Sequence, residues 1–221
     1  MKVDEKFKGV FFIDGRIATR NLVRDFRVHG ERLISADGVQ YRHWDPYRSK
    51  LAAAVIKGMK SMPIKSGSKV LYLGAAAGVT PSFISDIVGE KGIVYCVEFA
   101  PRSMRDLLYV CEKRSNMLPL LADARKTESY EKDVGKVDVV YEDVAQPDQE
   151  DIMIKNAQKF LKKGGYAILA IKSQSIDVTK QPKEIYEKLL GKLEKHFEIA
   201  ECYELSPFDK DHLFVLMRYT Q

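Results

Sequence analysis

Residues 70–99, VLYLGAAAGVTPSFISDIVGEKGIVYCVEF, predict a strand, a loop of small residues, a helix and a second strand in direct succession. The apolar run VLYL ends at Gly74. The helix that follows has Thr80 as a candidate cap and Pro81 in its first turn, and it is expected to end near Gly89. This order favours a parallel sheet, in which ligands bind beyond the carboxyl ends of the strands.

The same alternation of strands and helices continues to the C-terminus. Further strands are expected at residues 93–99, 118–121, 137–141, 166–172, 197–205 and 212–219, and helices at 101–115, 148–161 and 183–197. The amphipathic 148–161 helix has Asp148 as its expected cap and is expected to end at Lys162–Gly165, where cations precede two glycines. Strands rich in Val, Ile and Leu predict an α/β fold with a mostly parallel sheet covered on both faces.

The first 45 residues show no helical periodicity and predict a small antiparallel β unit. Val10–Ile13 is an apolar run closed by Asp14-Gly15, and a second Asp-Gly pair, at 37–38, separates two further apolar runs. Asp-Gly is a preferred sequence for tight turns between antiparallel strands. An alanine-rich helix is expected at Ser49–Lys60. We therefore expect two domains, a β-rich unit at residues 1–50 and an α/β unit at residues 51–221.

The composition is that of a compact intracellular protein. The 221 residues are 45% hydrophobic and 30% charged, which excludes collagen-like, disordered and disulfide-scaffold proteins. No apolar run reaches the roughly 18–20 residues of a membrane helix, and the N-terminus does not have the pattern of a signal peptide. Three widely spaced cysteines predict free thiols. The four histidines are not at metal-ligand spacing, so no metal site is expected.

The net charge of +5 is concentrated near the N-terminus. Residues 1–50 carry 11 Lys and Arg against 7 Asp and Glu, whereas the rest of the chain carries 25 against 24. Arg suits planar contacts with carboxylates and phosphates. The arginines at positions 16, 20, 24, 27, 32, 42 and 48 are therefore candidates for contact with an acidic partner, which the charge alone does not identify. A solvated surface without a partner is the alternative.

The loop LGAAAG at residues 73–78 favours a nucleoside ligand. A dinucleotide-binding G-x-G-x-x-G motif requires glycine where this chain has Ala76 and Val79, so NAD and FAD are disfavoured. Glu98 ends the next strand, where its carboxylate can accept hydrogen bonds from both ribose hydroxyls. With Asp123 ending the third strand, the pattern suits S-adenosylmethionine, which contains a nucleoside but no pyrophosphate. A tight turn without a ligand is the alternative.

Charged side chains also follow two further strands. Asp143 comes after the 137–141 strand, and Lys172 ends the 166–172 strand after six uncharged residues. Lys50 opens the alanine-rich helix. Two lysines around an aspartate suit the deprotonation of a hydroxyl, with one as the base and the other stabilising the developing oxyanion. The alternatives are a solvated loop acid at Asp143 and an ammonium that only reaches solvent at Lys172.

Four stretches together resemble the fibrillarin family: YRSKLAAA at 47–54, YLGAAAG at 72–78, VEF at 97–99 and DVAQPDQ at 143–149. Fibrillarin is the methyltransferase subunit of the box C/D guide-RNA ribonucleoprotein, and the resemblance covers nearly the whole chain. It implies a Rossmann-like class I S-adenosylmethionine-dependent methyltransferase fold with a mostly parallel seven-stranded sheet and a small β-rich N-terminal domain. It also implies methylation of ribose 2′-hydroxyls in rRNA, with tRNA as a further substrate.

The resemblance implies roles for individual residues. Cofactor contacts are expected from Gly74, Ala75, Ala76, Gly78, Thr80, Glu98, Phe99, Asp123, Ala124, Asp143 and Gln146. The catalytic set resembles the Lys-Asp-Lys-Glu tetrad of other ribose 2′-O-methyltransferases, with Lys50, Asp143 and Lys172 in its first three positions. His212 stands at the fourth position, where a catalytic or RNA-positioning role and an ordinary loop histidine are both open.

Two features depart from the family pattern. The chain starts directly at the folded region, without the Gly/Arg-rich tail of eukaryotic fibrillarins, so it resembles the archaeal type and is expected in the cytoplasm. Ala77 stands where many relatives have Ser.

The implied partners are a box C/D guide RNA with its target rRNA, a Nop-family scaffold protein and a kink-turn-binding ribosomal-type protein, with no membrane. A stand-alone RNA or small-molecule O-methyltransferase and a non-catalytic scaffold of the particle are the alternatives.

Overall fold

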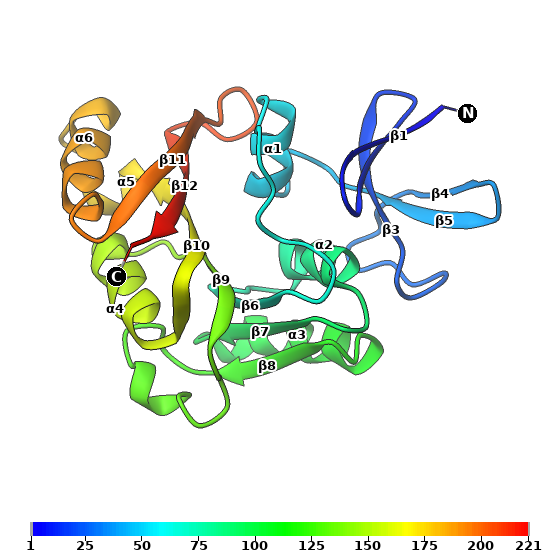
Figure 1. The fold of residues 1–221 in the computed structure, drawn as a ribbon, viewed down its shortest axis with the longest axis horizontal. Helices are drawn as coiled ribbons and strands as arrows, with labels where there is room; N and C mark the ends of the chain where they lie inside the picture. The colour runs from blue at the N-terminus through cyan, green and yellow to red at the C-terminus, as the bar shows by residue number, and fades with distance from the viewer. Residues whose placement is uncertain (1, 221) are drawn as a thin grey trace.

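The computed structural model describes residues 2–220, whose strands form two separate sheets (Figure 1). The N-terminal sheet is antiparallel, in the order β1-β2-β3-β5-β4. Its strands are β1 (Val3–Phe7), β2 (Val10–Ile13), β3 (Arg16–Arg20), β4 (Leu33–Ala36) and β5 (Val39–His43). Both Asp-Gly pairs form the expected two-residue turns, and all four turn residues have positive φ angles.

The larger sheet has seven strands in the order β11-β12-β10-β9-β6-β7-β8. They are β6 (Lys69–Leu73), β7 (Ile93–Glu98), β8 (Met117–Leu121), β9 (Val137–Glu142), β10 (Leu161–Lys172), β11 (Phe197–Glu204) and β12 (His212–Tyr219). Only β12 runs in the opposite direction to the other six strands, so the predicted mostly parallel seven-stranded sheet is confirmed. The strand order reverses between β6 and β9, which places a ligand site at their carboxyl ends.

Helices cover both faces of this sheet. They are α1 (Lys50–Ile56), α2 (Val79–Val88), α3 (Pro101–Lys113), α4 (Gln149–Phe160), α5 (Ser173–Ile176) and α6 (Pro182–Leu193), with a 3₁₀ turn at Thr127–Ser129. Val70 and Tyr72 of β6 belong to the apolar cluster that includes α1, α2 and α3. Leu71 and Leu73 belong to the cluster that includes α4 and α6. This alternation is that of a strand buried on both faces.

Several helix ends differ from the sequence predictions, among them the helix expected at 183–197, which ends at Leu193. The alanine-rich helix ends at Ile56 rather than Lys60, because Gly58 adopts a φ of +99° that breaks the helical path. The cap of α2 is Gly78, at φ +84°, and not Thr80, which lies inside the first turn next to Pro81. Lys162–Gly165 do not form a helix C-terminus. They lie within β10, in an irregular stretch between two paired segments.

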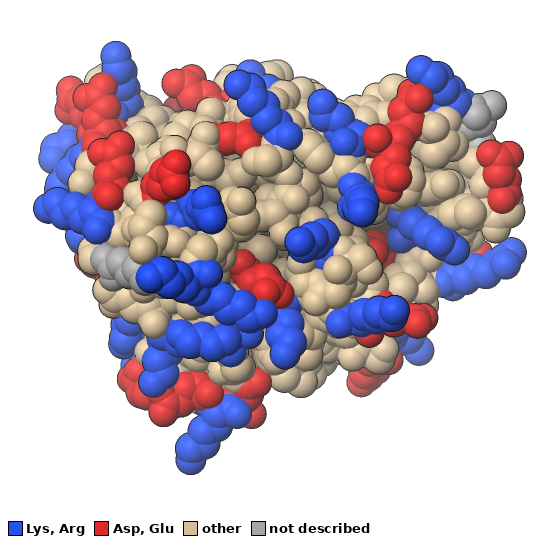
Figure 2. Space-filling model, viewed as in Figure 1, with Lys and Arg blue, Asp and Glu red and all other residues tan. Residues whose placement is uncertain are grey.

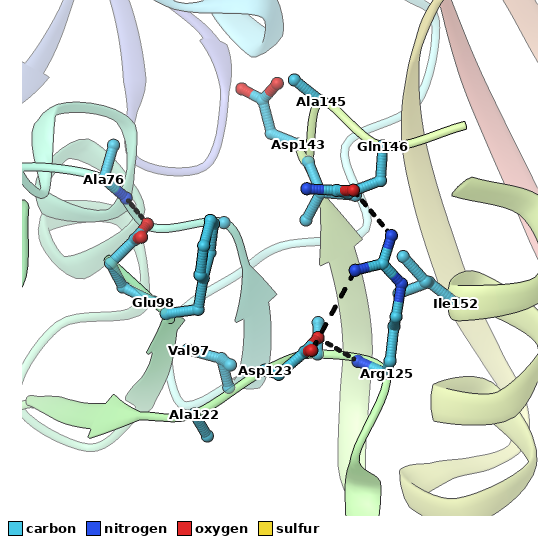
Figure 3. A pocket seen from close by; sticks show the side chains of 14 residues that line it. Ala76, Val97, Glu98, Ala122, Asp123, Arg125, Asp143, Ala145, Gln146 and Ile152 are labelled. Carbon is cyan, nitrogen blue, oxygen red and sulfur yellow. Dashed lines mark hydrogen bonds and ion pairs between the residues drawn. The ribbon is translucent and has the colours of Figure 1, made fainter. Parts of the chain in front are cut away.

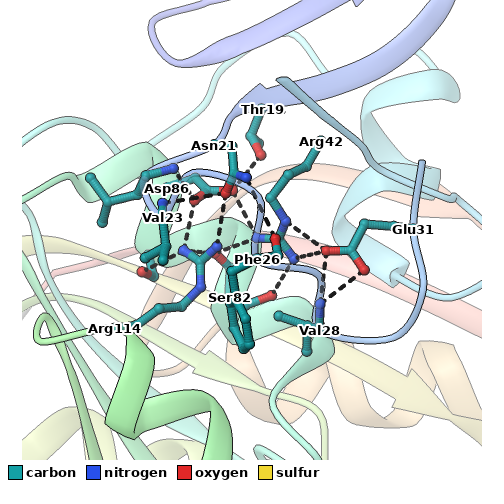
Figure 4. Close-up of polar contacts among 12 residues, drawn as sticks. Thr19, Asn21, Val23, Phe26, Val28, Glu31, Arg42, Ser82, Asp86 and Arg114 are labelled. Atoms are coloured by element: carbon teal, nitrogen blue, oxygen red, sulfur yellow. Dashed lines mark hydrogen bonds and ion pairs between the residues drawn. The ribbon is translucent and has the colours of Figure 1, made fainter. Parts of the chain in front are cut away.

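A buried ionic cluster connects the N-terminal sheet to helix α2 and the end of helix α3 in the α/β part of the chain (Figure 4). Asp86 of α2 accepts from Arg42 of β5 at 2.8 Å and from Arg114, which follows α3, at 2.7 Å. All three side chains are fully buried. Glu31 binds the other side of Arg42 at 2.6 Å. Although burial opposes its charge, Arg42 and backbone N–H donors lower the pKa of Glu31 to about 2.

This cluster corrects the interpretation of the N-terminal arginines. Arg42 is inaccessible and neutralised by Glu31 and Asp86, so it cannot contact RNA or a scaffold protein. The cluster also joins residues from both sides of the expected domain boundary at residue 50, and that boundary stays a prediction.

None of the helices between residues 2 and 220 has the length and apolar character needed to cross a bilayer.

Replacing Asp86 tests the ionic cluster. We expect Asp86→Ala to lower the free energy of unfolding by about 3–5 kcal/mol, because two buried guanidinium groups lose their shared carboxylate. Chemical denaturation measures the change. The matched control is Glu187→Ala, which removes an exposed carboxylate 4.0 Å from Lys183 and should cost less than about 0.5 kcal/mol. Equal losses in the two variants would contradict a special role for the cluster.

Candidate functional site

A cavity of about 370 Å³ opens at the carboxyl ends of β6, β7, β8 and β9 (Figure 3). This is the position expected from the reversal in strand order. The lining combines apolar walls with carboxylates from three different strand ends. It consists of Gly74, Ala76, Val97, Glu98, Phe99, Ala122, Asp123, Ala124, Arg125, Asp143, Val144, Ala145, Gln146 and Ile152.

The loop after β6 shapes one wall of the cavity through two unusual backbone positions. Gly74 has a φ of +83°, and a Cβ atom there would lie 2.6 Å from the carbonyl oxygen of Asp143, so only glycine fits. Ala76 has a φ of +47° and donates its N–H to Glu98 Oε2 at 2.8 Å. Ala100 N–H binds Glu98 Oε1 at 2.8 Å. The Glu98 carboxylate is thus fixed at the wall, and each oxygen can still accept another hydrogen bond.

The opposite wall joins the loops after β8 and β9. Arg125 donates to Gln146 Oε1 at 2.6 Å and to both carboxylate oxygens of Asp148, at 2.8 and 2.9 Å. These hydrogen bonds lower the pKa of Asp148. Asp148 occupies the cap position of α4, but its side chain makes no capping hydrogen bond. The expected capping role is therefore wrong, because the carboxylate binds Arg125 instead.

Phe99 adds an exposed apolar surface to the cavity. Its side chain follows β7 directly after Glu98 and is 65% exposed although it is a large hydrophobic residue. A flat ring beside two carboxylates suits an aromatic heterocycle that carries hydroxyl and amino groups.

Most residues predicted to contact a cofactor line the cavity: Gly74, Ala76, Glu98, Phe99, Asp123, Ala124, Asp143 and Gln146. Three do not line it. Ala75 is buried beneath the loop, and a Cβ atom on Gly78 would meet Leu107 of α3 at 2.9 Å. The hydroxyl of Thr80 is buried and donates to Ser49 Oγ at 3.1 Å. These three residues therefore belong to the packing of the loop and not to the lining of the cavity.

A row of side chains with alternating charge begins at Asp143, which also lines the cavity. Lys50 Nζ lies 2.9 Å from Asp143 Oδ1 and 3.7 Å from Asp209 Oδ2. Burial of the ammonium disfavours its charge, but the two carboxylates outweigh this and raise the pKa of Lys50 above its ordinary value. Lys50 is therefore held as a cation between two acids, which suits it to stabilise negative charge and not to accept a proton.

His212 continues this row on the other side of Asp209. Its Nδ1 lies 2.9 Å from Asp209 Oδ1 and 2.7 Å from the carbonyl oxygen of Lys210. Two acceptors at one ring nitrogen place a proton on Nδ1. Lys172 is the register partner of His212 between β10 and β12. Within residues 2–220 its ammonium has no ion pair, unlike that of Lys50.

Two carboxyl groups, those of Glu142 and Asp143, follow one another at the end of β9 and differ in burial. The neighbouring Glu142 is fully buried, and neither of its oxygens has a hydrogen-bond partner within the described chain. Burial raises the pKa of Glu142 well above its usual range, because a buried carboxylate loses the stabilisation that water gives its charge.

Sequence reasoning missed two polar residues of this site. Asp209 bridges Lys50 and His212, and its position three residues before His212 in a turn-rich loop was the available signal. Arg125 lies two residues after Asp123, where it joins two loops that are distant in sequence. No local pattern marks Arg125, because its partners come from the loop after another strand. The apolar lining residues Val97, Ala122 and Ile152 were also not predicted.

Comparisons of the sequence and the fold with known proteins agree on one family. The whole chain, residues 1–221, matches the family model described as Fibrillarin. A Methanopyrus kandleri protein named fibrillarin-like rRNA/tRNA 2′-O-methyltransferase is 52% identical over 97% of this chain and 95% of its own length.

Two solved structures have nearly the same fold. Aeropyrum pernix fibrillarin with natively bound S-adenosyl-L-methionine is similar with a TM-score of 0.91 and 48% identity, covering 98% of each chain. A chain of a fibrillarin/Nop5p complex is similar with a TM-score of 0.89 and 37% identity, covering 98% of this chain and all of that one.

The close approach at Gly74 can be tested against a matched glycine. Gly74→Ala and Gly38→Ala both place a side chain at positive φ, +83° and +77°, but nothing lies within 4 Å of a Cβ atom at Gly38. We expect Gly74→Ala to cost about 1–3 kcal/mol more of unfolding free energy, because the loop after β9 must move. Denaturation of both variants gives the difference. Equal costs would mean that the two loops separate freely.

The pairing of Lys50 can be tested by titration. We expect Asp209→Asn to lower the pKa of Lys50, because one of the two carboxylates that stabilise its ammonium is lost. Asp143→Asn should lower it further, since that carboxylate is closer. Lysine side-chain NMR over a range of pH measures both shifts, and Lys50→Met identifies the signal. An unchanged Lys50 titration in Asp209→Asn would remove Asp209 from the site.

Proposed function

This chain belongs to the fibrillarin family, and we propose that it transfers a methyl group from S-adenosylmethionine to ribose 2′-hydroxyls of rRNA and tRNA. The observation that carries the proposal is the juxtaposition at Asp143. This residue lines the nucleoside-sized cavity and also pairs with Lys50, so the donor site and the charged cluster share one side chain. The names of the relatives support the same activity.

The cavity residues fit the cofactor by their chemistry. The fixed Glu98 carboxylate can accept from ribose hydroxyls, and Asp123 can accept from an amino group. Phe99 offers a face for the adenine ring. The carboxylate of Asp143 can attract the ammonium of the methionine part. When bound, S-adenosylmethionine supplies a methyl group on a positively charged sulfur.

The charged cluster would prepare the 2′-hydroxyl of the RNA. The Lys50 ammonium, held by Asp143 and Asp209, would stabilise the oxygen as negative charge develops on it. Lys172 has no carboxylate partner among the described residues, and in its neutral form it would accept the hydroxyl proton. His212, with Nδ1 bound to Asp209, would orient the ribose. Holding the reactants together would remove much of the entropic barrier.

We propose that partner molecules choose the target. Residues 51–221 carry a net charge of only +1, and Lys and Arg are interspersed with Asp and Glu over most of the visible face (Figure 2). Such a surface binds RNA weakly without help. A fibrillarin/Nop5p complex supports a Nop-family scaffold as a partner. A box C/D guide RNA, its target RNA and a kink-turn-binding protein would complete the particle, in the cytoplasm of an archaeal-type cell.

The proposed base can be tested in the assembled particle. We expect Lys172→Ala to slow single-turnover methyl transfer to a guide–target duplex by about 100-fold or more, because the proton acceptor is lost. Lys163→Ala, at the other end of β10, is the matched control and should keep the normal rate. Calorimetry with S-adenosylmethionine should give similar affinities for both variants.

Each contrary outcome removes a different part of the proposal. A near-normal rate for Lys172→Ala removes this residue from the mechanism. Absence of cofactor binding to the unmodified chain favours a non-catalytic scaffold. Efficient transfer by the chain without partners overturns the choice of target by guide RNA.

A further inference from the structure

An exposed aromatic pair lies on the two segments that carry the charged cluster. Tyr47 is 67% exposed, and its ring meets that of Phe208 edge-on, with the centroids 5.1 Å apart and the planes at 70°. Phe208 is partly buried and packs against the main apolar cluster. The Tyr47–Phe208 pair therefore has one anchored ring and one ring that presents apolar surface to solvent.

The backbone that carries Tyr47 is held in place. Asp45 accepts from the Tyr47 N–H at 2.9 Å through its side chain and from the Arg48 N–H at 3.1 Å through its carbonyl. Ser49 is buried and binds Thr80, and Lys50 begins α1 with its ammonium bound to Asp143 and Asp209. An exposed ring on a fixed backbone loses little conformational entropy when it binds a partner.

The pair is next to the groups assigned to the methyl-accepting ribose. Tyr47 precedes Lys50 by three residues, a span of at most about 11 Å between their Cα atoms. Phe208 directly precedes Asp209, which binds both Lys50 and His212. The Tyr47–Phe208 pair therefore lies three residues from Lys50 on one segment and directly beside Asp209 on the other.

We propose that the Tyr47 ring stacks on a nucleobase of the RNA substrate, at the target nucleotide or one directly beside it. The inference rests on the proposed function and adds a substrate-binding surface to it. Bases stack on exposed aromatic side chains irrespective of sequence, which suits an enzyme whose targets are chosen by a guide. Arg48, also exposed, supplies a cation for the adjoining phosphate. A cation beside an open ring favours RNA over an apolar protein segment.

Three variants in the assembled particle test this surface. We expect Tyr47→Ala to raise the KM for target RNA by about 5- to 100-fold, the effect usual for loss of one stacked base. Tyr47→Trp should restore it, because any large flat ring can stack. Tyr109→Ala is the matched control, since this tyrosine is 57% exposed on α3 beside Phe26 and should leave the KM unchanged.

A spectroscopic readout separates stacking from a general loss of activity. Target RNAs would carry 2-aminopurine, a base whose fluorescence falls on stacking, at the target position or at either neighbour. We expect quenching at one of the three positions with the unmodified chain and with Tyr47→Trp, and its loss with Tyr47→Ala. Affinity for S-adenosylmethionine, measured by calorimetry, should be the same in all variants.

Two results would overturn the inference. One is a Tyr47→Ala particle with an RNA KM within twofold of normal and unchanged quenching at all three positions. The other is a Tyr47→Ala chain that fails to join the scaffold protein, which would make the pair a protein contact. Failure of the proposed function itself is distinct, because then the unmodified chain would show no cofactor binding or no methyl transfer.

Discussion

The contact between Gly74 and the backbone of Asp143 determines the geometry of the whole site. The loops after β6 and β9 come so close that a Cβ atom would lie 2.6 Å from the Asp143 carbonyl oxygen. This approach sets the separation of two loops that line the cavity and the position of the Asp143 backbone. The cavity and the Lys50 cluster meet at this residue, so one backbone contact sets the position of each relative to the other.

A second constraint links the N-terminal sheet to this site. Asp86 joins Arg42 and Arg114 in a fully buried cluster, and the segment that leaves the N-terminal sheet leads through Tyr47 to Lys50. Of the 11 Lys and Arg residues in the first 50 positions, Arg42 is thus internal, and its charge is balanced by Glu31 and Asp86.

The two lysines of the site differ in their surroundings and therefore in their chemistry. Lys50 lies between two carboxylates, which raise its pKa and hold it as a cation. Lys172, at the end of a buried strand, lacks such a partner within residues 2–220. Asp143 contributes most to the raised pKa of Lys50, and Asp209 adds to it while also binding His212. An acid that bridges two functional groups positions both of them.

The sequence by itself determined the alternation of strands and helices, the turns at both Asp-Gly pairs and the strand-end positions of Glu98, Asp123, Asp143 and Lys172, because these depend on local periodicity and turn chemistry. Only the tertiary structure decided that Arg42 is buried, that Asp148 binds Arg125 instead of capping α4, and that Asp209 joins Lys50 to His212. Asp209 and His212 are only three residues apart, but the other pairings link segments distant in the sequence, where no local pattern records which charges will meet.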